Sequence, residues 1–388
     1  MRILIASTAY YFRLDGQDVF TLNLAEGLAQ RGHTVLSLFT SDSGKPGSDE
    51  RNGVRLEALN SIHLAWLHPE AYMPAFFGAK VRSVFDDFQP EIVHVQDHFP
   101  VCRAVVHEAK KRKIKIVGTN HFMPENVAQY VPVLSRVKPL FNWIAWRWVL
   151  SCYNHLDMVT AQSRASADLI RANGLRVPVY PVSCGINFNR FHPLPSVDRL
   201  AVRARYGLDP SCTLFLFVGR LEQEKRVDVL LHALKKLNRN DVQLVIAGRG
   251  TAQNELQTLA KSLGVWDRVR FTGFVPNEDL TALLNSIDIF TMPSEAELLS
   301  IASLEAMACG RPLLLANAVA LPELVTHGVN GYLFKPGDPE DAARYMSLLA
   351  DHPEQWEAMG KASLEKAQAH SLENTIQRYE TLYKDALK

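Results

Sequence analysis

The sequence predicts an α/β protein made of two doubly wound, parallel-sheet domains. Short apolar strands alternate with helical segments along the first half of the chain, and the same rhythm restarts after residue 212. Between the two halves, residues 192–212 contain Pro193, Pro195, Gly207 and Pro210 and predict a linker with a short helix. The length of 388 residues also exceeds what one hydrophobic core usually holds.

The first half alternates strongly enough for its elements to be placed in order. Gly32 closes a helix in which Val19, Leu22, Leu24 and Leu28 recur at roughly helical spacing. The predicted strands lie at 2–7, 34–40, 54–59, 91–97, 115–121, 157–163 and 178–186, and the predicted helices at 19–33, near 74–88 and near 100–112.

The second half repeats this pattern and ends in an amphipathic helix. The predicted strands lie at 213–220, 242–250, 269–274, 288–294, 311–317 and 331–337, with helices at 227–237 and 255–264. We therefore predict a first domain over residues 1–191, a second over 192–370 and a terminal helix over 371–388. Two such domains facing each other would form a cleft at the carboxyl ends of their strands, where ligands of such sheets bind.

Composition narrows the class of protein. Hydrophobic residues make up 47% and charged residues 21%, an ordinary globular balance, and the net charge of +1 argues against a general nucleic-acid binder. The five widely spaced cysteines show no zinc-ligand spacing and fit a reducing cytosol. The first twelve residues read as a strand and not as a signal peptide, and no apolar run is long enough to span a bilayer. We expect a cytoplasmic protein.

Two segments of the second half combine charge with helix starts. In VGRLEQEKRVDVLLHAL, Gly219 ends a strand, and Arg220 and Lys225 precede a helix, an arrangement that suits a diphosphate. A solvated loop in which acids alternate with these cations is the alternative. The glycines of IAGRG at 246–250 are by themselves a weak signal.

In SEAELLSIASLEAMACG, three acids stand in an apolar setting, where an unpaired carboxylate is costly. Glu297 is expected in the turn before a helix that begins with Leu299 and Ser300, and Glu305 inside that helix. Carboxylates accept hydrogen bonds from sugar hydroxyls, so the two acids could hold a polyhydroxylated ligand. The alternative is a capping box between Ser294 and Glu297, which leaves Glu305 unexplained.

The first half offers weaker candidates. His121 stands just past a strand, at an edge where ligands bind, with Glu125 and Asn126 after it. Gly16 opens a helix and could present its N–H to a phosphate, although a plain turn explains it better. Asp97 and His98 follow another strand, and His94 within that strand is expected to be buried.

Together these motifs resemble the retaining GT-B glycosyltransferases of family four. The spacing of Glu297 and Glu305, followed by Ala-Met-Ala-x-Gly, resembles the family signature, and the segment 218–234 resembles its diphosphate loop. FTGFVPNEDL, LPELVTHGVNGYLFKPGD and GINFNRFHP resemble further family segments in the same order. The match covers nearly the whole chain.

The resemblance implies a GT-B fold, a nucleotide-sugar donor and a set of roles. Arg220 and Lys225 would bind the diphosphate, Glu305 the ribose and Glu297 the transferred sugar, with retention of anomeric configuration and no metal. Backbone around Leu298, Leu299 and Ser300 would contact phosphate or sugar, Val275 would face the base, Gly16 would approach the diphosphate, and His121 would contact the sugar. The C-terminal helix would cross back to the first domain.

The sequence departs from the family pattern in two places that bear on the donor. Asp15-Gly16 replaces the usual Gly-Gly of the first loop, and ELLS replaces Glu-Gly-Phe-Gly after the first acid. Leu298 and Leu299 therefore reshape the sugar pocket and leave the sugar open. A UDP-linked hexose is the default expectation.

Residues 110–150 bear on the acceptor. The segment KKRKIK at 110–115 is dense in cations, and Trp143, Trp146 and Trp148 follow, interspersed with Arg147 and Lys138. This pattern suits the surface of an anionic bilayer and indicates a membrane lipid acceptor such as diacylglycerol, with the protein peripheral on the inner face of the cell membrane. The alternative is an internal helix that packs on the first sheet, with a soluble acceptor.

Other activities remain open on the same fold. A sugar-nucleotide epimerase generally lacks the full Arg/Lys loop together with the spaced acids. An NAD-dependent oxidoreductase needs a Gly-x-Gly-x-x-Gly turn after the first strand, which STAYYFRLDGQD does not supply. A non-catalytic sugar-nucleotide sensor is the remaining alternative, and donor turnover would distinguish it from an enzyme.

Overall fold

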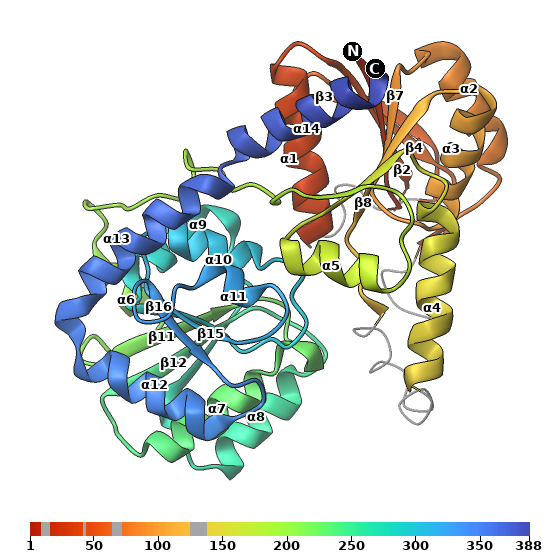
Figure 1. The fold of residues 1–388 in the computed structure, drawn as a ribbon. Coiled ribbons are helices and arrows are strands. Elements are labelled where there is room, and N and C mark those ends of the chain that lie inside the picture. The colour runs from red at the N-terminus through yellow and green to blue at the C-terminus, as the bar shows by residue number, and fades with distance from the viewer. Residues whose placement is uncertain (9–15, 42–43, 64–71, 125–137) are drawn as a thin grey trace. The chain divides into compact units, whose positions relative to one another are not determined.

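The computed structural model describes residues 1–8, 16–41, 44–63, 72–124 and 138–388 and divides into two compact units (Figure 1). Unit 1 comprises Met1–Gly185 and Leu372–Lys388, and unit 2 comprises Ile186–Ser371. The junction lies six residues before the predicted position at residue 191 because Ile186 pairs with Ser371 in a parallel bridge. Among the described helices, none combines the length and apolarity needed to span a bilayer.

Unit 1 is built on one twisted sheet with the strand order β10-β9-β8-β7-β1-β2-β4-β3. Its strands are β1 (Arg2–Ala6), β2 (Thr34–Thr40), β3 (Gly47–Arg51), β4 (Val54–Leu59), β7 (Ile92–Val95), β8 (Lys115–Asn120), β9 (Met158–Ala161) and β10 (Val179–Pro181), and β5 (Ser61–His63) pairs separately with β6 (Tyr72–Pro74). Its helices are α1 (Gly16–Gln30), α2 (Gly78–Phe88), α3 (Pro100–Lys111), α4 (Lys138–Tyr153), α5 (Arg164–Ala172) and α14 (Leu372–Leu387).

One strand of this sheet departs from the predicted parallel arrangement. β3 runs antiparallel to β4 at the sheet edge, and all five of its residues are exposed. Its sequence, GSDER, contains no apolar residue, so it carries no strand pattern that sequence analysis could detect. The central strands, by contrast, are buried along their whole length, as a sheet covered by helices requires.

Helix α14, at the end of the chain, belongs to unit 1 and lies beside α1 (Figure 1). The two helices approach so closely that a Cβ on Gly27 would stand 2.1 Å from Ile376 Cδ1. Tyr383 contacts His94 Nδ1 at 2.7 Å, and the Tyr379 hydroxyl contacts Thr160 at 2.9 Å. The buried face of α14 therefore carries hydroxyls that satisfy polar side chains within the sheet.

Unit 2 is a parallel sheet with the strand order β13-β12-β11-β14-β15-β16. Its strands are β11 (Thr213–Val218), β12 (Val242–Ala247), β13 (Val269–Gly273), β14 (Ile289–Met292), β15 (Leu313–Ala316) and β16 (Gly331–Phe334). Its helices are α6 (Arg199–Arg205), α7 (Val227–Leu237), α8 (Gln253–Ser262), α9 (Asn277–Ser286), α10 (Ile301–Ala308), α11 (Leu321–Leu324), α12 (Pro339–Asp351) and α13 (Trp356–Ala367).

The two buried sheets confirm the predicted α/β fold class. Each strand predicted from an apolar run is present within five residues of its expected bounds, because such runs bury well on a sheet covered on both faces.

Candidate functional site

The carboxyl edge of the unit 2 sheet gathers the charged residues that the sequence singled out. After β11, the chain passes through Gly219 and Arg220 into a short 3-10 turn, Gln223–Lys225, that leads to α7. After β14, residues 293–300 form the loop that carries Glu295 and Glu297 to α10. Because β11 and β14 are neighbours in the sheet, these two loops lie side by side.

Two ion pairs join these loops. Lys225 Nζ donates to Glu297 Oε1 at 2.6 Å, and both side chains are largely buried. Next to this pair, Arg226 Nη1 donates to Glu295 Oε1. Two of the three acids in the apolar segment are therefore met by cations of the β11–α7 loop, which resolves the cost of placing them there.

Unlike Lys225 and Arg226, Arg220 has an exposed side chain that a ligand can reach. Its side chain is 64% exposed, and its nearest carboxylate oxygen, Glu224 Oε1, lies 3.8 Å away. Glu224 itself is buried, while its carbonyl accepts a hydrogen bond from the Ser294 hydroxyl. The alternating acids of this loop thus have structural roles, and Arg220 points a guanidinium toward solvent beside a strand end.

Glu305, the third acid of this segment, forms no ion pair among the described residues. It stands on α10, and burial raises the pKa of its carboxyl to about 7, an effect that the positive charge of Arg190 partly opposes. Near neutral pH this carboxyl is divided between its charged and neutral forms. It can therefore both donate a hydrogen bond to and accept one from a hydroxyl group.

The observed start of α10 differs from the predicted one and rules out the proposed capping box. The helix begins at Ile301 with Ser300 as its N-cap, whose hydroxyl accepts from the Ser303 N–H at 3.2 Å. Ser294 bonds the Glu224 carbonyl instead, so the capping box between Ser294 and Glu297 is wrong. The predicted start at Leu299 is two residues early, because both Leu298 and Leu299 bury their side chains in the preceding loop.

The glycines at 248 and 250 have a packing explanation. A Cβ at Gly248 would lie 1.8 Å from the Gly219 carbonyl oxygen, and one at Gly250 would lie 2.3 Å from that of Leu221. These glycines let the end of β12 pass against the end of β11. They shape the loop that bears Arg220 without offering a side chain to a ligand.

Val275 follows β13 and is buried, whereas the preceding Phe274 is 48% exposed. A ring that is half exposed beside a strand end is better placed to stack on a flat ligand than a buried valine. Sequence reasoning passed over Phe274 because one aromatic residue at a strand end is not distinctive.

In unit 1, three neighbouring strands end in a linked set of polar side chains. His121 follows β8, and its Nε2 lies 3.0 Å from Gln96 Oε1, which follows β7. Gln162, which follows β9, donates to His121 Nδ1. The proton of His121 therefore resides on Nε2. Burial lowers the pKa of His121 to about 3, so the ring is neutral at physiological pH.

The other unit 1 candidates have structural roles or fall outside the described residues. Asp97 accepts the N–H groups of Thr8 and Phe99 at 2.6 and 2.9 Å, and His94 is fully buried as predicted. His98 is enclosed by aromatic rings, with Trp148 at 4.5 Å between centroids. Gly16 is the first residue of α1. Glu125 and Asn126 lie outside the described residues.

The described residues contain no cluster of side chains suited to bind a metal ion. No group of three or more His, Cys, Asp or Glu side chains in those ranges is arranged to hold an ion. That the reaction needs no metal stays a prediction.

Two family models match the chain, one in each half. The family model "Glycosyltransferase Family 4" matches residues 14–190, and the model "Glycosyl transferases group 1" matches residues 198–366. The chain belongs to this glycosyltransferase family, as its motifs predicted.

Relatives and solved structures agree with that assignment. The chain is 26% identical over 356 residues to sulfoquinovosyl transferase SQD2 of Arabidopsis thaliana, covering 90% of this chain and 66% of the plant protein. It is 29% identical to a D-inositol 3-phosphate glycosyltransferase of Geodermatophilus obscurus, covering 93% of this chain and 82% of that one. Anabaena Alr3699/HepE, solved with UDP-glucose, superposes with a TM-score of 0.80 at 20% identity over 99% and 100% of the two chains. The GT-B fold prediction is confirmed.

Proposed function

We propose that this glycosyltransferase transfers a hexose from a UDP-sugar with retention of configuration. The observation that carries the proposal is the joined pair of loops at the carboxyl edge of unit 2, where Lys225 and Glu297 meet at 2.6 Å. A solved protein of the same fold was crystallised with UDP-glucose, which supports this donor class.

The roles follow from charge and exposure. The exposed Arg220 and the buried Lys225 would bind the diphosphate, helped by N–H groups at the start of α10, which have no acceptors within the helix. As the sugar–phosphate bond breaks, negative charge collects on the leaving diphosphate, and these fixed cations stabilise it. Backbone at Leu298, Leu299 and Ser300 would complete the anion contacts.

Glu297 and Glu305 would hold hydroxyls. Once the diphosphate engages Lys225, the Glu297 carboxylate becomes free to accept from the transferred sugar. Glu305, with its pKa near 7, would bond the ribose. Phe274 would face the base beside Val275. In unit 1, Gly16 and His121 remain proposed contacts to the nucleotide sugar, with the Nε2–H of His121 exchanging its bond to Gln96 for one to the sugar.

A panel of sugar nucleotides tests the donor. UDP-glucose, UDP-galactose, GDP-mannose and ADP-glucose would be compared for their effect on the unfolding temperature and for turnover. We expect a UDP-hexose to give the largest rise in unfolding temperature, because a ligand that binds the folded state stabilises it by mass action. Stabilisation without turnover for every donor would indicate a sensor, and no stabilisation by any donor would refute the proposed site.

We further propose a lipid acceptor reached at an anionic membrane surface. Helix α4 buries Trp146 and Val149 but exposes Leu140, Trp143, Ile144 and Trp148, each by 42–58%. These four residues recur at helical spacing, and Arg147 stacks over the Trp143 ring at 5.0 Å. An apolar stripe with aromatic residues and a cation suits the bilayer interface.

The charge contribution to membrane binding is smaller than the sequence indicates. Arg112 pairs with Asp86 and Glu108, and Lys115 pairs with Asp157, so part of the basic segment is already neutralised. We therefore expect the aromatic stripe of α4 to contribute more than KKRKIK.

Vesicle sedimentation at low salt tests this surface. Phosphatidylglycerol vesicles should retain the wild-type protein, and Trp143→Ala should lose roughly tenfold in partitioning, as expected for removal of one interfacial aromatic anchor. Trp266→Ala is a matched control, because Lys261 stacks over this exposed ring of unit 2 at 4.8 Å. A wild-type protein that ignores these vesicles while its donor hydrolysis is intact would refute the lipid acceptor.

A soluble phosphorylated acceptor is the second candidate. Its support is that one relative is named for D-inositol 3-phosphate. Transfer to this acceptor in the absence of lipid would favour it over the membrane proposal.

A further inference from the structure

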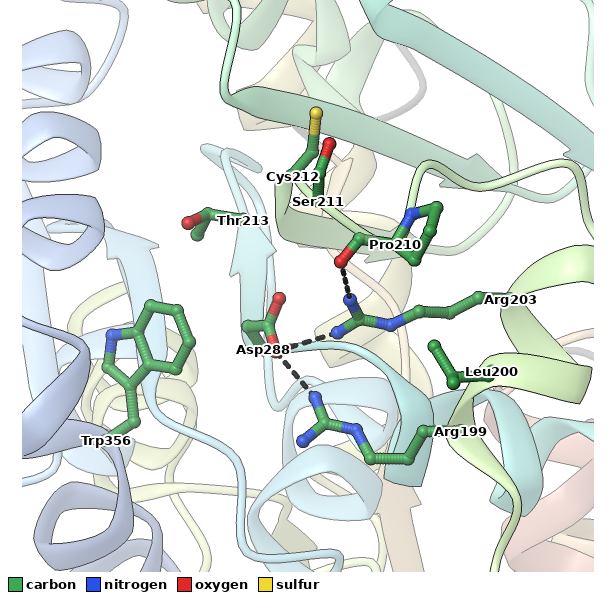
Figure 2. Close-up of a pocket in the computed structure, with 9 residues that line it drawn as sticks. All are labelled: Arg199, Leu200, Arg203, Pro210, Ser211, Cys212, Thr213, Asp288 and Trp356. Atoms are coloured by element: carbon green, nitrogen blue, oxygen red, sulfur yellow. Dashed lines mark hydrogen bonds and ion pairs between the residues drawn. The ribbon is translucent and has the colours of Figure 1, made fainter.

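A cavity of about 450 Å³ lies in unit 2, lined by residues of α6, of the segment entering β11, and of α13 (Figure 2). Thr213 is the first residue of β11, and Asp288 immediately precedes β14. The cavity is therefore at the amino edge of the sheet, whereas Arg220 and Lys225 follow the carboxyl end of β11. The proposed donor site does not use it.

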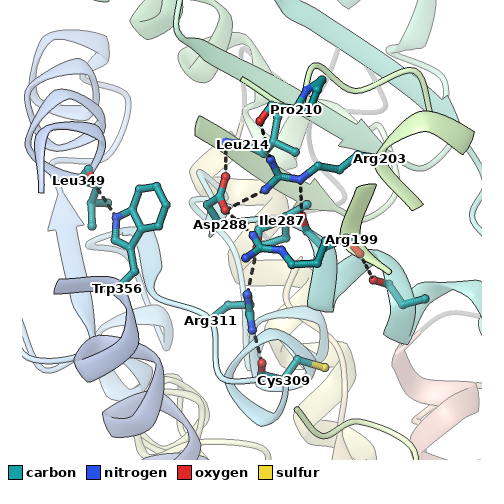
Figure 3. Close-up of polar contacts among 12 residues, drawn as sticks. Arg199, Arg203, Pro210, Leu214, Ile287, Asp288, Cys309, Arg311, Leu349 and Trp356 are labelled. Carbon is teal, nitrogen blue, oxygen red and sulfur yellow. Dashed lines mark hydrogen bonds and ion pairs between the residues drawn. The ribbon is translucent and has the colours of Figure 1, made fainter. Parts of the chain in front are cut away.

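Two guanidinium groups line this cavity around one carboxylate, and a third lies close to them (Figure 3). Arg199 Nη2 and Arg203 Nη2 both donate to Asp288 Oδ1, at 2.6 and 2.9 Å. Asp288 Oδ2 accepts the Leu214 N–H at 2.9 Å, so both carboxylate oxygens are engaged. Arg311 lies behind them and donates to carbonyl oxygens.

The positive charge of this group is not fully compensated. Burial lowers the pKa of Arg311, and the charges of Arg199 and Arg203 lower it further, against the opposing effect of Asp288. Like charges held together in a partly desolvated place repel one another. An anion entering the cavity would relieve this repulsion.

A purely structural explanation accounts for two of the three arginines. Arg203 donates to the Ser286 carbonyl at 2.8 Å, and Arg311 donates to the Ile287 and Cys309 carbonyls, each at 3.0 Å. These bonds fasten the ends of α9 and α10. Arg199 is different, because its side chain is 45% exposed and its Nε and Nη1 have no acceptor among the described residues.

The wall of the cavity opposite the arginines is formed by Trp356. Figure 2 shows the indole of Trp356 across the cavity from the two guanidiniums, and Thr213, the first residue of β11, also lines the cavity. The Trp356 N–H is already bonded to the Leu349 carbonyl, so the indole offers an apolar face. The free Nη1 of Arg199 can donate to a phosphate oxygen, and an indole face suits an uncharged organic body. The volume falls in the range of small-molecule sites.

We propose that this cavity is a second ligand site, which binds a small phosphomonoester with its phosphate on the exposed guanidinium of Arg199 and its organic body against Trp356. The inference does not depend on the identity of the donor or acceptor.

Cys212 provides a local measure of occupancy. It lines the cavity and is half-buried, whereas the other four cysteines, at 102, 152, 184 and 309, are buried. Alkylation by iodoacetamide at pH 8, followed by peptide mass spectrometry, therefore reports on this cavity and not on the donor edge. Glucose 6-phosphate, inorganic phosphate and glucose would be compared at ionic strength matched with KCl.

We expect saturating glucose 6-phosphate to slow alkylation of Cys212 at least fivefold and to act at lower concentration than inorganic phosphate. Glucose and KCl should have no effect. Arg199→Gln should abolish the protection and Thr213→Val should weaken it, while Arg220→Gln, a change of an exposed arginine at the donor edge, should retain it.

Four results would overturn the proposal. These are an unprotected wild type, protection that survives in both Arg199→Gln and Thr213→Val, equal protection by KCl, and inorganic phosphate that acts as well as glucose 6-phosphate. Native circular dichroism and unfolding temperature of each variant establish that a loss of protection is local.

Discussion

The linked sets of polar side chains at the carboxyl edges of the two sheets differ in charge. In unit 1, neighbouring strands end in Gln96, His121 and Gln162, an uncharged set in which burial keeps the imidazole neutral. In unit 2, the corresponding edge carries the ion pair of Lys225 with Glu297 and that of Arg226 with Glu295. An uncharged set can orient a hydrogen-bond donor, whereas a charged set can stabilise an anionic leaving group. The proposed roles of the two sets should therefore be separable by substitution.

The largest effect should come from removing the buried cation of unit 2. Lys225→Ala removes a contact to the diphosphate and leaves Glu297 without its cation, so kcat/KM should fall about 10²–10³-fold. UDP affinity, measured by calorimetry, should fall as well. Lys236→Ala is the matched control, because Lys236 forms an exposed pair with Glu340 at 2.7 Å in the same unit. An unchanged UDP affinity in Lys225→Ala would remove Lys225 from the diphosphate site.

Glu297→Gln tests the other half of the pair. The amide keeps the shape of the carboxylate but accepts sugar hydroxyls less well, so kcat should fall roughly 10–100-fold. UDP affinity should hold or rise, because Lys225 is released from its partner. Calorimetry and steady-state rates measured on the same preparation separate the two effects. An equal loss of UDP affinity in both variants would contradict the proposed division of roles.

His121 should matter for rate but not for pH dependence. His121→Ala removes the Nε2–H donor, and we expect kcat to fall about tenfold, as for the loss of one hydrogen bond. Because the pKa of His121 is about 3, the ring is neutral from pH 5 to 9, and the apparent pKa of the pH–rate profile should be the same in variant and wild type. If a limb between pH 5 and 8 disappeared in the variant, His121 would be the titrating group.

The smallest expected effect is on the way the free energy of unfolding depends on pH through Glu305. The pKa of this carboxyl is about 7 in the folded protein and near 4.5 in the unfolded chain, so the folded state holds more protons between these values. Stability is therefore full below about pH 4.5 and decreases as the pH rises toward 7. Glu305→Gln removes this decrease and should gain about 1 kcal/mol relative to wild type between pH 5 and 8, a figure reduced for partial exposure.

Urea unfolding at pH 5, 6.5 and 8 measures that change, with Glu340→Gln as the control for an exposed glutamate of the same unit. A relative stability of Glu305→Gln that does not vary with pH would show that the carboxyl is not shifted in the native protein.

Local pattern was sufficient where an element is apolar and regular. The apolar strands of both sheets and the charged loop before α7 could be predicted because burial imposes an apolar run and a turn needs glycine or polar residues. β3 could not be predicted because an exposed edge strand is held by backbone pairing to β4, which leaves no mark in GSDER. The start of α10 was predicted two residues early because the apolar pair Leu298–Leu299 continues the helical pattern of the sequence, whereas the structure buries it in the loop before the N-cap Ser300.

The sequence by itself determined the two repeating α/β segments, the glycine and charge pattern at the strand ends, and the family. Tertiary structure decided which charges meet. Lys225 and Glu297 are 72 positions apart, and only the adjacency of β11 and β14 brings them together. It also decided that Glu305 titrates near neutrality and that His121 does not, since a pKa depends on burial and on neighbours from distant parts of the chain.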